Sequence, residues 1–334
     1  MEEPHSKRQR ILSGVQPSGK LHLGNYFGAI QQHIALQEEG ECFFFIADFH
    51  ALTTIQDRAA LRENVRAVAL DYLALGLDPE KAAFFRQSDV PEVTELAWIL
   101  STVTGMGLLE RAHSYKDKLA RGMTATVGLF NYPVLMAADI LIYRSNLVPV
   151  GQDQVQHIEM TRDMAGYFNQ TWKKVFPLPE ARIERAVVVP GTDGKKMSKS
   201  YGNTIDIFAE GPALKSAVMK IVTDSTPVEA PKDPEKDNVF ALYCLLATPS
   251  EADALAARYR AGGLGYGDAK KLLIEKIDSR FGPARAKRQE LEKDPERVEA
   301  ALRRGAERAG SVARETMRRV REAVGLVGTG GGRR

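Results

Sequence analysis

The sequence predicts an α/β fold in which a doubly wound parallel sheet precedes an all-helical C-terminal domain. Short apolar runs alternate with helical patterns over roughly the first 200 residues, and this alternation is typical of parallel sheets. Beyond about Ile207 the strand patterns disappear and helical patterns continue. Ligands of such sheets bind beyond the carboxyl ends of the strands. We therefore expect a site in the loops that follow the strands.

Five apolar segments are predicted to be strands, with helices between them. Asp57 is expected to cap one helix and Gly76 to end it, while Pro91 opens the next. The predicted strands cover residues 10–15, 42–48, 82–86, 146–151 and 187–189. The predicted helices cover residues 25–39, 57–75, a segment from Pro91, 132–143 and 152–168.

The chain divides into residues 1–205, which carry the strands, residues 206–324, which are helical, and a glycine-rich tail, 325–334, predicted to be disordered. The last helix either belongs to the helical domain or packs back on the sheet. The helical segments after residue 205 are expected at 211–222, 237–247, 251–260, 267–280, 284–293 and 295–324.

The composition is that of a soluble globular protein, with 44% apolar and 27% charged residues in 334. No apolar run approaches the roughly 18–20 residues of a membrane span, and the charged start lacks the apolar core of a signal peptide. Cys42 and Cys244 both lie in apolar segments. Buried free thiols in a reducing cytoplasm are therefore expected. The spacings typical of zinc sites are missing from the sequence.

Positive charge is concentrated at the C-terminus. Residues 285–334 hold 14 Lys/Arg and 8 Asp/Glu, so the rest of the chain has a net charge of −3. A basic surplus suits a polyanionic partner. The alternative is a solvated helix face with ion pairs one turn apart, and charge alone favours that alternative.

One carboxylate, Asp139, lies inside the apolar helical run of residues 132–143. A buried carboxylate is costly unless a donor meets it. The donor is either an internal Arg or Lys, or a group that arrives with a ligand.

Two further stretches suit phosphate. His22, Gly24 and Asn25 stand at a helix N-terminus, where free backbone N–H groups and the helix dipole attract anions. Lys196–Ser200 places two ammonium groups three residues apart on a glycine-flanked loop. Such a loop can stabilise the charge that grows on a leaving pyrophosphate. Each stretch alone is also compatible with an ordinary helix start or a solvated basic loop.

Together these motifs resemble a known family. H-L-G-N and K-M-S-K-S, about 170 residues apart around an α/β sheet, are similar to the two signatures of class I aminoacyl-tRNA synthetases, which have a Rossmann-like sheet. The segments S-G-V-Q-P-S-G, Y-P-V-L-M-A-A-D-I-L and V-P-V-G-Q-D-Q-x-Q-H-I-E-x-T-R-D follow the order of the bacterial tryptophanyl branch. The resemblance covers roughly residues 10–325.

The resemblance implies an enzyme that joins L-tryptophan to ATP, releases pyrophosphate and transfers the amino acid to tRNA(Trp). It implies Mg²⁺ carried by ATP, without zinc or an iron–sulfur cluster. It also implies a cytoplasmic homodimer without membrane contact, whose helical domain reads the anticodon.

The resemblance also assigns site residues. The residues that attend the reacting phosphates would be His22, Asn25, Lys196 and Lys199. The ATP-binding residues would be Gln16, Pro17, Ser18, Gly24, Asn25, Gly151, Gln152, Asp153, Val189, Lys196, Met197, Ser198, Lys199 and Ser200. The tryptophan-binding residues would be Gly14, Gln16, His50, Tyr132, Met136, Asp139, Ile140, Val148, Val150 and Gln154. Among these, Asp139 would accept the indole N–H, which is a donor only.

Three positions depart from the wider pattern. Asn25 stands where the class often has His, Leu12 where many members have Phe, and Tyr201-Gly202-Asn203 where Asp-Pro-Asn is common. These departures indicate a divergent or second-copy form. Two alternatives stay open: a tyrosine-specific sister, since Asp139 can also accept a phenol hydroxyl, and a non-catalytic paralogue that binds tRNA.

Overall fold

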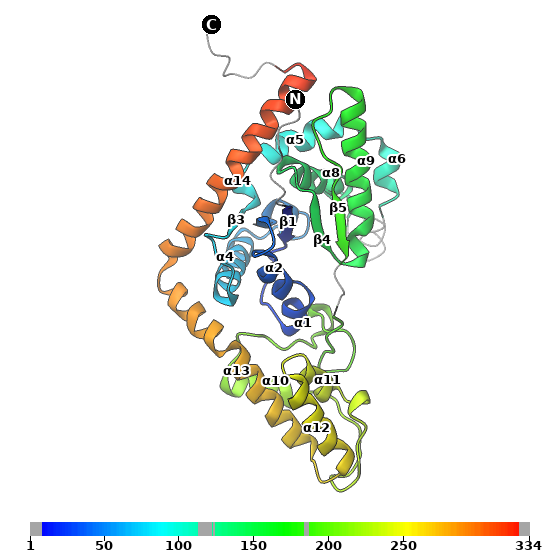
Figure 1. Ribbon diagram of the computed structural model, residues 1–334, viewed down its shortest axis with the longest axis vertical. Helices are drawn as coiled ribbons and strands as arrows, with labels where there is room; N and C mark the ends of the chain where they lie inside the picture. The colour runs from blue at the N-terminus through cyan, green and yellow to red at the C-terminus, as the bar shows by residue number, and fades with distance from the viewer. Residues whose placement is uncertain (1–8, 113–121, 123, 184–186, 327–334) are drawn as a thin grey trace.

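The computed structural model describes residues 9–112, 122, 124–183 and 187–326 (Figure 1). The described part of the chain contains a five-stranded parallel sheet in the order β3-β2-β1-β4-β5. The order reverses between β1 and β4, and this reversal defines the switch point of a doubly wound sheet. The predicted fold class is therefore confirmed. The strands are β1 Arg10–Val15, β2 Glu41–Ile46, β3 Ala82–Arg86, β4 Leu147–Val150 and β5 Glu180–Ile183.

The fifth strand is not the predicted one. Residues 187–189 form no strand, because only Val189 is buried, whereas Val187 and Val188 are exposed. The edge strand is Glu180–Ile183 instead, which pairs with β4. Its short sequence, E-A-R-I, has no apolar run and is partly exposed, so a pattern search does not find it. The sheet supplies the pairing that the local sequence does not indicate.

The helices of the first half follow the predicted order. In α4, the Ala60 N–H donates to the Asp57 carboxylate at 2.7 Å, and Gly76 ends the helix with a φ of 111°. The segment predicted as one helix over 25–39 contains a π-helical turn between two α-helical pieces. The bounds are α1 Leu23–Asn25, η1 Tyr26–Ile30, α2 Gln31–Leu36, α3 Asp48–Ala51, α4 Arg58–Leu75, η2 Gln87–Asp89, α5 Glu92–Ser101, α6 Met106–Glu110, α8 Val127–Ile142, η3 Gln152–Gln154 and α9 Val155–Thr171.

From Lys199 onward, all the helix and strand elements of the described chain are helices. The predicted break between 280 and 284 is wrong, because α13 runs continuously through Pro283. A proline inside a helix removes one hydrogen bond, but buried Phe281 and Arg285 anchor the helix on both sides of it. The bounds are η4 Lys199–Tyr201, α10 Gly211–Met219, η5 Pro234–Lys236, α11 Asn238–Cys244, α12 Pro249–Ala261, α13 Tyr266–Glu292 and α14 Pro295–Val324.

The last helix, α14, lies against β3 and α5 and runs along the edge of the sheet (Figure 1). A Cβ atom at Gly305 would overlap the backbone of Phe84 in β3, so the two backbones are in direct contact. The tail predicted to be disordered falls outside the described residues from 327 onward.

Each face of the sheet packs on its own hydrophobic cluster. Side chains alternate along β2, so Phe44 joins the cluster with α4 and α13, while Phe43 and Phe45 join the cluster with α5, α8 and α14. Cys42 is buried and Cys244 half-buried, and both are free thiols in the described chain. None of the described helices combines the length and apolar character that crossing a bilayer requires.

Candidate active site

A pocket of about 520 Å³ lies at the carboxyl ends of β1 and β4, where the strand order reverses. Ligand pockets of this fold are expected there. All the side chains assigned to tryptophan binding by sequence line it. They are Gly14, Gln16, His50, Tyr132, Met136, Asp139, Ile140, Val148, Val150 and Gln154.

Asp139 is 2% exposed and carries two internal donors. His50 Nε2 lies 2.8 Å from Asp139 Oδ2, and Gln87 Nε2 donates to Oδ1 at 2.7 Å. The expectation of an internal Arg or Lys is therefore wrong, and so is the idea that the carboxylate lacks a donor until a ligand arrives. Burial raises the pKa of Asp139, and the hydrogen bonds from His50 and Gln87 oppose that rise.

Gln87 holds this arrangement in one orientation. Its Oε1 accepts from the backbone N–H groups of Phe49 at 3.1 Å and His50 at 3.4 Å. The amide nitrogen must therefore face Asp139. Gln87 directly follows β3, so its side chain connects the end of this strand to α3 and α8. Sequence reasoning missed Gln87. The available signal was a glutamine directly after a buried strand, at the edge where ligands bind.

A second polar network crosses the pocket wall. Ser13 Oγ lies 2.9 Å from His33 Nε2, and His33 Nδ1 lies 3.1 Å from the Tyr72 hydroxyl. Burial lowers the pKa of His33 to about 4, so His33 is neutral at pH 7. Ser13 and His33 both line the pocket and were also missed by sequence reasoning.

The two stretches expected to bind phosphate touch each other although they are far apart in sequence. The Gly24 N–H donates to Met197 Sδ at 3.4 Å, and a Cβ at Gly24 would lie 3.3 Å from Met197 Cβ. Asn25 Oδ1 accepts from the His22 backbone N–H at 3.1 Å. Glycine at position 24 therefore lets the lysine loop approach the start of α1.

His22 is the N-cap residue of α1. It is 6% exposed, and its Nδ1 lacks a hydrogen-bond partner among the described residues. Burial, and then the charge of Lys199, lower the pKa of His22 to about 4. The ring is thus neutral at pH 7, and it can donate or accept one hydrogen bond.

Lys199 spans the gap between the lysine loop and the loop after β1. Its Nζ donates to the Ser18 carbonyl at 2.8 Å. Burial lowers the pKa of Lys199, and nearby Asp206 and Asp71 partly oppose this. Lys196 is exposed, so its ammonium group is accessible to a ligand.

Asn203 fixes the shape of the lysine loop. Its Nδ2 donates to Asp193 Oδ1 at 2.6 Å and to the Lys196 carbonyl at 3.2 Å, and its Oδ1 accepts from the Ser198 N–H at 2.8 Å. A Cβ at Gly191 would overlap the Asn203 side chain. Asn203 was noted in the sequence only as part of a departure from the common pattern, and its role in the loop was missed.

The other residues assigned to ATP surround the same edge. Gln16 and Gly151 line the pocket, and the Met197 N–H donates to the Val189 carbonyl at 2.8 Å. The side chain of Asp153 lies outside the described part of the structure. The remaining ones stand in the loop after β1, at the start of α1, in η3 and in the lysine loop: Pro17, Ser18, Gly24, Asn25, Gln152, Lys196, Ser198, Lys199 and Ser200.

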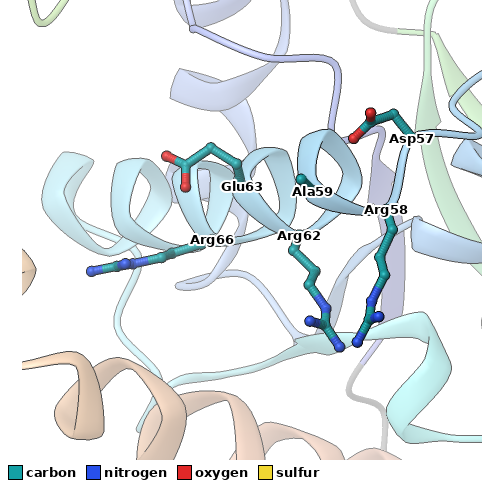
Figure 2. Close-up of a pocket in the computed structure, with 6 residues that line it drawn as sticks. All are labelled: Asp57, Arg58, Ala59, Arg62, Glu63 and Arg66. Carbon is teal, nitrogen blue, oxygen red and sulfur yellow. The ribbon is translucent and has the colours of Figure 1, made fainter.

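A separate hollow of about 640 Å³ lies on the outside of α4 (Figure 2). It is more open than the pocket at the switch point, and most of its lining side chains are charged. Its lining residues are Asp57, Arg58, Ala59, Arg62, Glu63 and Arg66.

A parallel sheet that reverses its order beside a pocket, with a lysine loop and a helix start at the same edge, defines a class I nucleotide-binding catalytic domain. The chain belongs to the tRNA synthetases class I (W and Y), the family whose model matches residues 4–282.

Curated relatives match almost the full chain. A tryptophan–tRNA ligase of Rhodopirellula baltica is 57% identical over 318 residues, which cover 95% of this chain and 99% of the relative. A tryptophan–tRNA ligase of Fusobacterium nucleatum is 53% identical over 322 residues, which cover 96% of this chain and 99% of the relative.

Among solved structures, tryptophanyl-tRNA synthetase from Campylobacter jejuni complexed with ADP and tryptophan has a TM-score of 0.92 at 51% identity. The match covers 95% of this chain and 100% of that one. A tyrosyl-tRNA synthetase from Archaeoglobus fulgidus shares the fold alone, with a TM-score of 0.65 at 21% identity.

Proposed function

We propose that this protein is a tryptophan–tRNA ligase. It activates L-tryptophan with ATP, releases pyrophosphate, and transfers the amino acid from the adenylate to tRNA(Trp). The observation that carries the proposal is a buried carboxylate, Asp139, held by His50 and Gln87 in an otherwise largely apolar pocket. The relatives at 46–57% identity that bear this name support it.

Recognition of the indole follows from hydrogen-bond chemistry. An indole nitrogen can only donate, so its partner must be an acceptor, and Asp139 keeps acceptor capacity beyond its two internal bonds. Phenylalanine would leave that capacity unused in a buried site. Sites built around such a hydrogen bond discriminate by about 10⁴-fold or more. Met136, Ile140 and Val148 supply the apolar wall.

Activation of tryptophan needs positioning more than acid–base chemistry. The substrate carboxylate is already the nucleophile, so holding it in line with the α-phosphate accounts for much of the rate. Lys196 and Lys199 neutralise the charge that grows on pyrophosphate. To do so, Lys199 exchanges the Ser18 carbonyl for phosphate oxygens.

Magnesium enters on the phosphates of ATP in this proposal. The residues assigned to the reacting phosphates, His22, Asn25, Lys196 and Lys199, include no carboxylate, whereas Mg²⁺ is usually held by carboxylate and other oxygen ligands. Within the described ranges, no group of three or more His, Cys, Asp or Glu could hold a metal. When bound, the cation supplies charge neutralisation on the phosphates.

The tRNA is charged in the cytoplasm, and the helices α10 to α13 bind its anticodon. The two free thiols suit that reducing compartment. Most of this helical part lies at the far end of the elongated molecule from β1 (Figure 1), and a bound tRNA must span such a distance.

The working form is a homodimer. Trp98, Met106 and Val127 are 73%, 63% and 82% exposed, which is unusual for large apolar side chains. A hollow of about 350 Å³ is lined by Ala97 and Gly128, the chain neighbours of Trp98 and Val127, and by Tyr132, which also lines the amino-acid pocket. A second copy that covers this face would therefore border the site. Trp98→Glu should convert the dimer to a monomer in light scattering, and an unchanged mass would refute this interface.

The decisive experiment is amino-acid-dependent ATP–pyrophosphate exchange with each of the twenty amino acids. Exchange with tryptophan alone is expected. Exchange with tyrosine instead would identify the tyrosine-specific sister, and tRNA binding without any exchange would identify a non-catalytic paralogue.

A further inference from the structure

Three arginines form a row along the exposed side of α4. Arg58, Arg62 and Arg66 are spaced one turn apart and line the open hollow of about 640 Å³. Arg58 and Arg62 extend from the same side of the helix, Arg66 stands one turn further on and points along the helix away from them, and Glu63 projects from the opposite side (Figure 2). We call these three residues the α4 arginine row.

The row is unfavourable for the helix by itself. Like charges four residues apart destabilise a helix by about 0.2–0.5 kcal/mol per pair. Within the described part of the chain, none of the three arginines forms an ion pair with a carboxylate. Their charge is therefore available to a partner outside the chain.

The C-terminal surplus of positive charge behaves differently. Every one of the arginines in α14 already has an internal partner, which is a carboxylate for seven and backbone carbonyls for Arg308. The pairs are Arg297–Glu290, Arg303–Glu296, Arg304–Glu80, Arg314–Glu92, Arg318–Glu315, Arg319–Glu315 and Arg321–Glu95. The basic surplus read from sequence is thus largely neutralised on α14, whereas the α4 row is not.

The helix that carries the row also borders an active-site loop, but through a different face. On the same helix, Asn64 Oδ1 lies 3.7 Å from where a Cβ of Gly19 would stand, in the loop whose Ser18 holds Lys199. Arg62 precedes Asn64 by two residues, which is about 200° around an α-helix. The row therefore does not belong to the ATP site. It suits a larger polyanion that passes over α4 and ends in the site.

We propose that the α4 arginine row binds the phosphate backbone of the tRNA acceptor arm. The inference rests on the proposed function, because only a tRNA brings its 3′ end to the adenylate. Residues four apart on a helix rise about 6 Å, so successive arginines can contact successive phosphates of one strand. Contacts of this kind add affinity and salt dependence without reading sequence.

The test compares two matched variants of the full-length protein. One is Arg58→Gln/Arg62→Gln/Arg66→Gln, and the control is Arg303→Gln/Arg318→Gln/Arg319→Gln, which removes the same charge from α14. Glutamine has nearly the same helix propensity as arginine, so the substitutions remove charge without weakening the helix. Binding of a tRNA(Trp) transcript is measured from 50 to 200 mM salt, together with tryptophan-dependent pyrophosphate exchange.

The α4 variant should bind tRNA at least 10-fold more weakly and lower the slope of log K against log salt by about 2–3, since each lost phosphate contact contributes roughly 0.7–0.9. Its pyrophosphate exchange should equal that of the wild type, which also shows that it is folded. The control should change the slope by less than 1. On a transcript that lacks the acceptor stem, wild type and α4 variant should bind equally.

Three results would overturn the inference. They are an unchanged slope in the α4 variant, an equal loss in the α14 control, and a difference that persists on the truncated transcript. Failure of the proposed function looks different, because the wild type itself would then lack tryptophan-dependent exchange.

Discussion

At the scale of single residues, the site depends on a carboxylate whose donors come from different parts of the chain. His50 stands on α3, Gln87 follows β3, and Asp139 lies within α8. The hydrogen bonds among them fix both oxygens of Asp139 before any ligand binds. An acceptor that is already oriented loses less freedom when the indole arrives, and preorganisation of this kind increases affinity.

Gln87 therefore acts as a positioning residue. Gln87→Leu removes the donor to Asp139 and the acceptor of the His50 N–H, at a cost of about 1–3 kcal/mol, while the Phe49 N–H keeps the Asp48 carboxylate as its acceptor. We expect the KM for tryptophan in pyrophosphate exchange to rise about 10- to 100-fold, with the KM for ATP nearly constant. Gln87→Glu should recover affinity as the pH falls, because only the protonated side chain can donate to Asp139. Equal losses for both substrates, without pH recovery, would assign Gln87 to folding alone.

In the proposed function, Asp139 is the residue that selects the amino acid. Asp139→Ala should lower kcat/KM for tryptophan by about 100-fold, since hydrogen bonds to charged groups contribute about 1.5–3 kcal/mol. It should leave ATP binding nearly unchanged, because the residues proposed to bind the phosphates, His22, Lys196 and Lys199, do not line the pocket that holds Asp139. Exchange kinetics with each substrate varied in turn measure both effects. If ATP binding falls as steeply as tryptophan activation, Asp139 has a structural role.

At the scale of elements, the packing of α14 on β3 depends on a glycine. Gly305→Ala would place a methyl group on the Phe84 backbone, which cannot move without disturbing the sheet. Overpacking of this kind costs about 1–3 kcal/mol. Chemical denaturation should show that loss. The control is Gly282→Ala in α13, where the added methyl group meets nothing within 4 Å. It should be neutral or stabilise by about 0.5–1 kcal/mol, and equal losses in both variants would contradict the packing argument.

Sequence predicts elements well where local chemistry determines them. β1 and α4 were predicted within a residue, because an apolar run, an N-cap aspartate and a terminal glycine are local signals. Prediction from sequence fails where contacts with distant residues determine the structure, as in β5 and in α13 around Pro283. The same holds for the site. The buried charge of Asp139 could be recognised from its neighbours, whereas Gln87 could not, since its partners lie 37 to 52 residues away.

At the scale of the whole molecule, α13 fastens the helical part to the sheet. Arg280 donates to the Tyr26 hydroxyl at 2.6 Å, Arg285 to the Ile207 carbonyl at 3.0 Å, and Arg288 to Asp71 of α4 at 2.6 Å. α13 therefore contacts two elements of the sheet domain. One is α4, which carries the arginine row, and the other is η1, which directly follows α1. α13 is therefore the element through which the helical part contacts both.

The Asp71–Arg288 contact makes the stability of this joint depend on pH. Burial raises the pKa of Asp71 from 3.8 to about 6, and the hydrogen bond and charge of Arg288 only partly oppose it. Between those two values the folded state binds more protons than the unfolded state, so stability falls as pH rises from about 4 to 6. This pKa shift corresponds to about 3 kcal/mol in the free energy of unfolding.

Relative to Asp71→Asn, the wild type should lose about this much free energy of unfolding between pH 4 and pH 7 in chemical denaturation. Asp268→Asn, at an exposed ion pair on α13, should leave the pH profile unchanged. Parallel profiles for wild type and Asp71→Asn would mean that Arg288 compensates fully for the burial of Asp71.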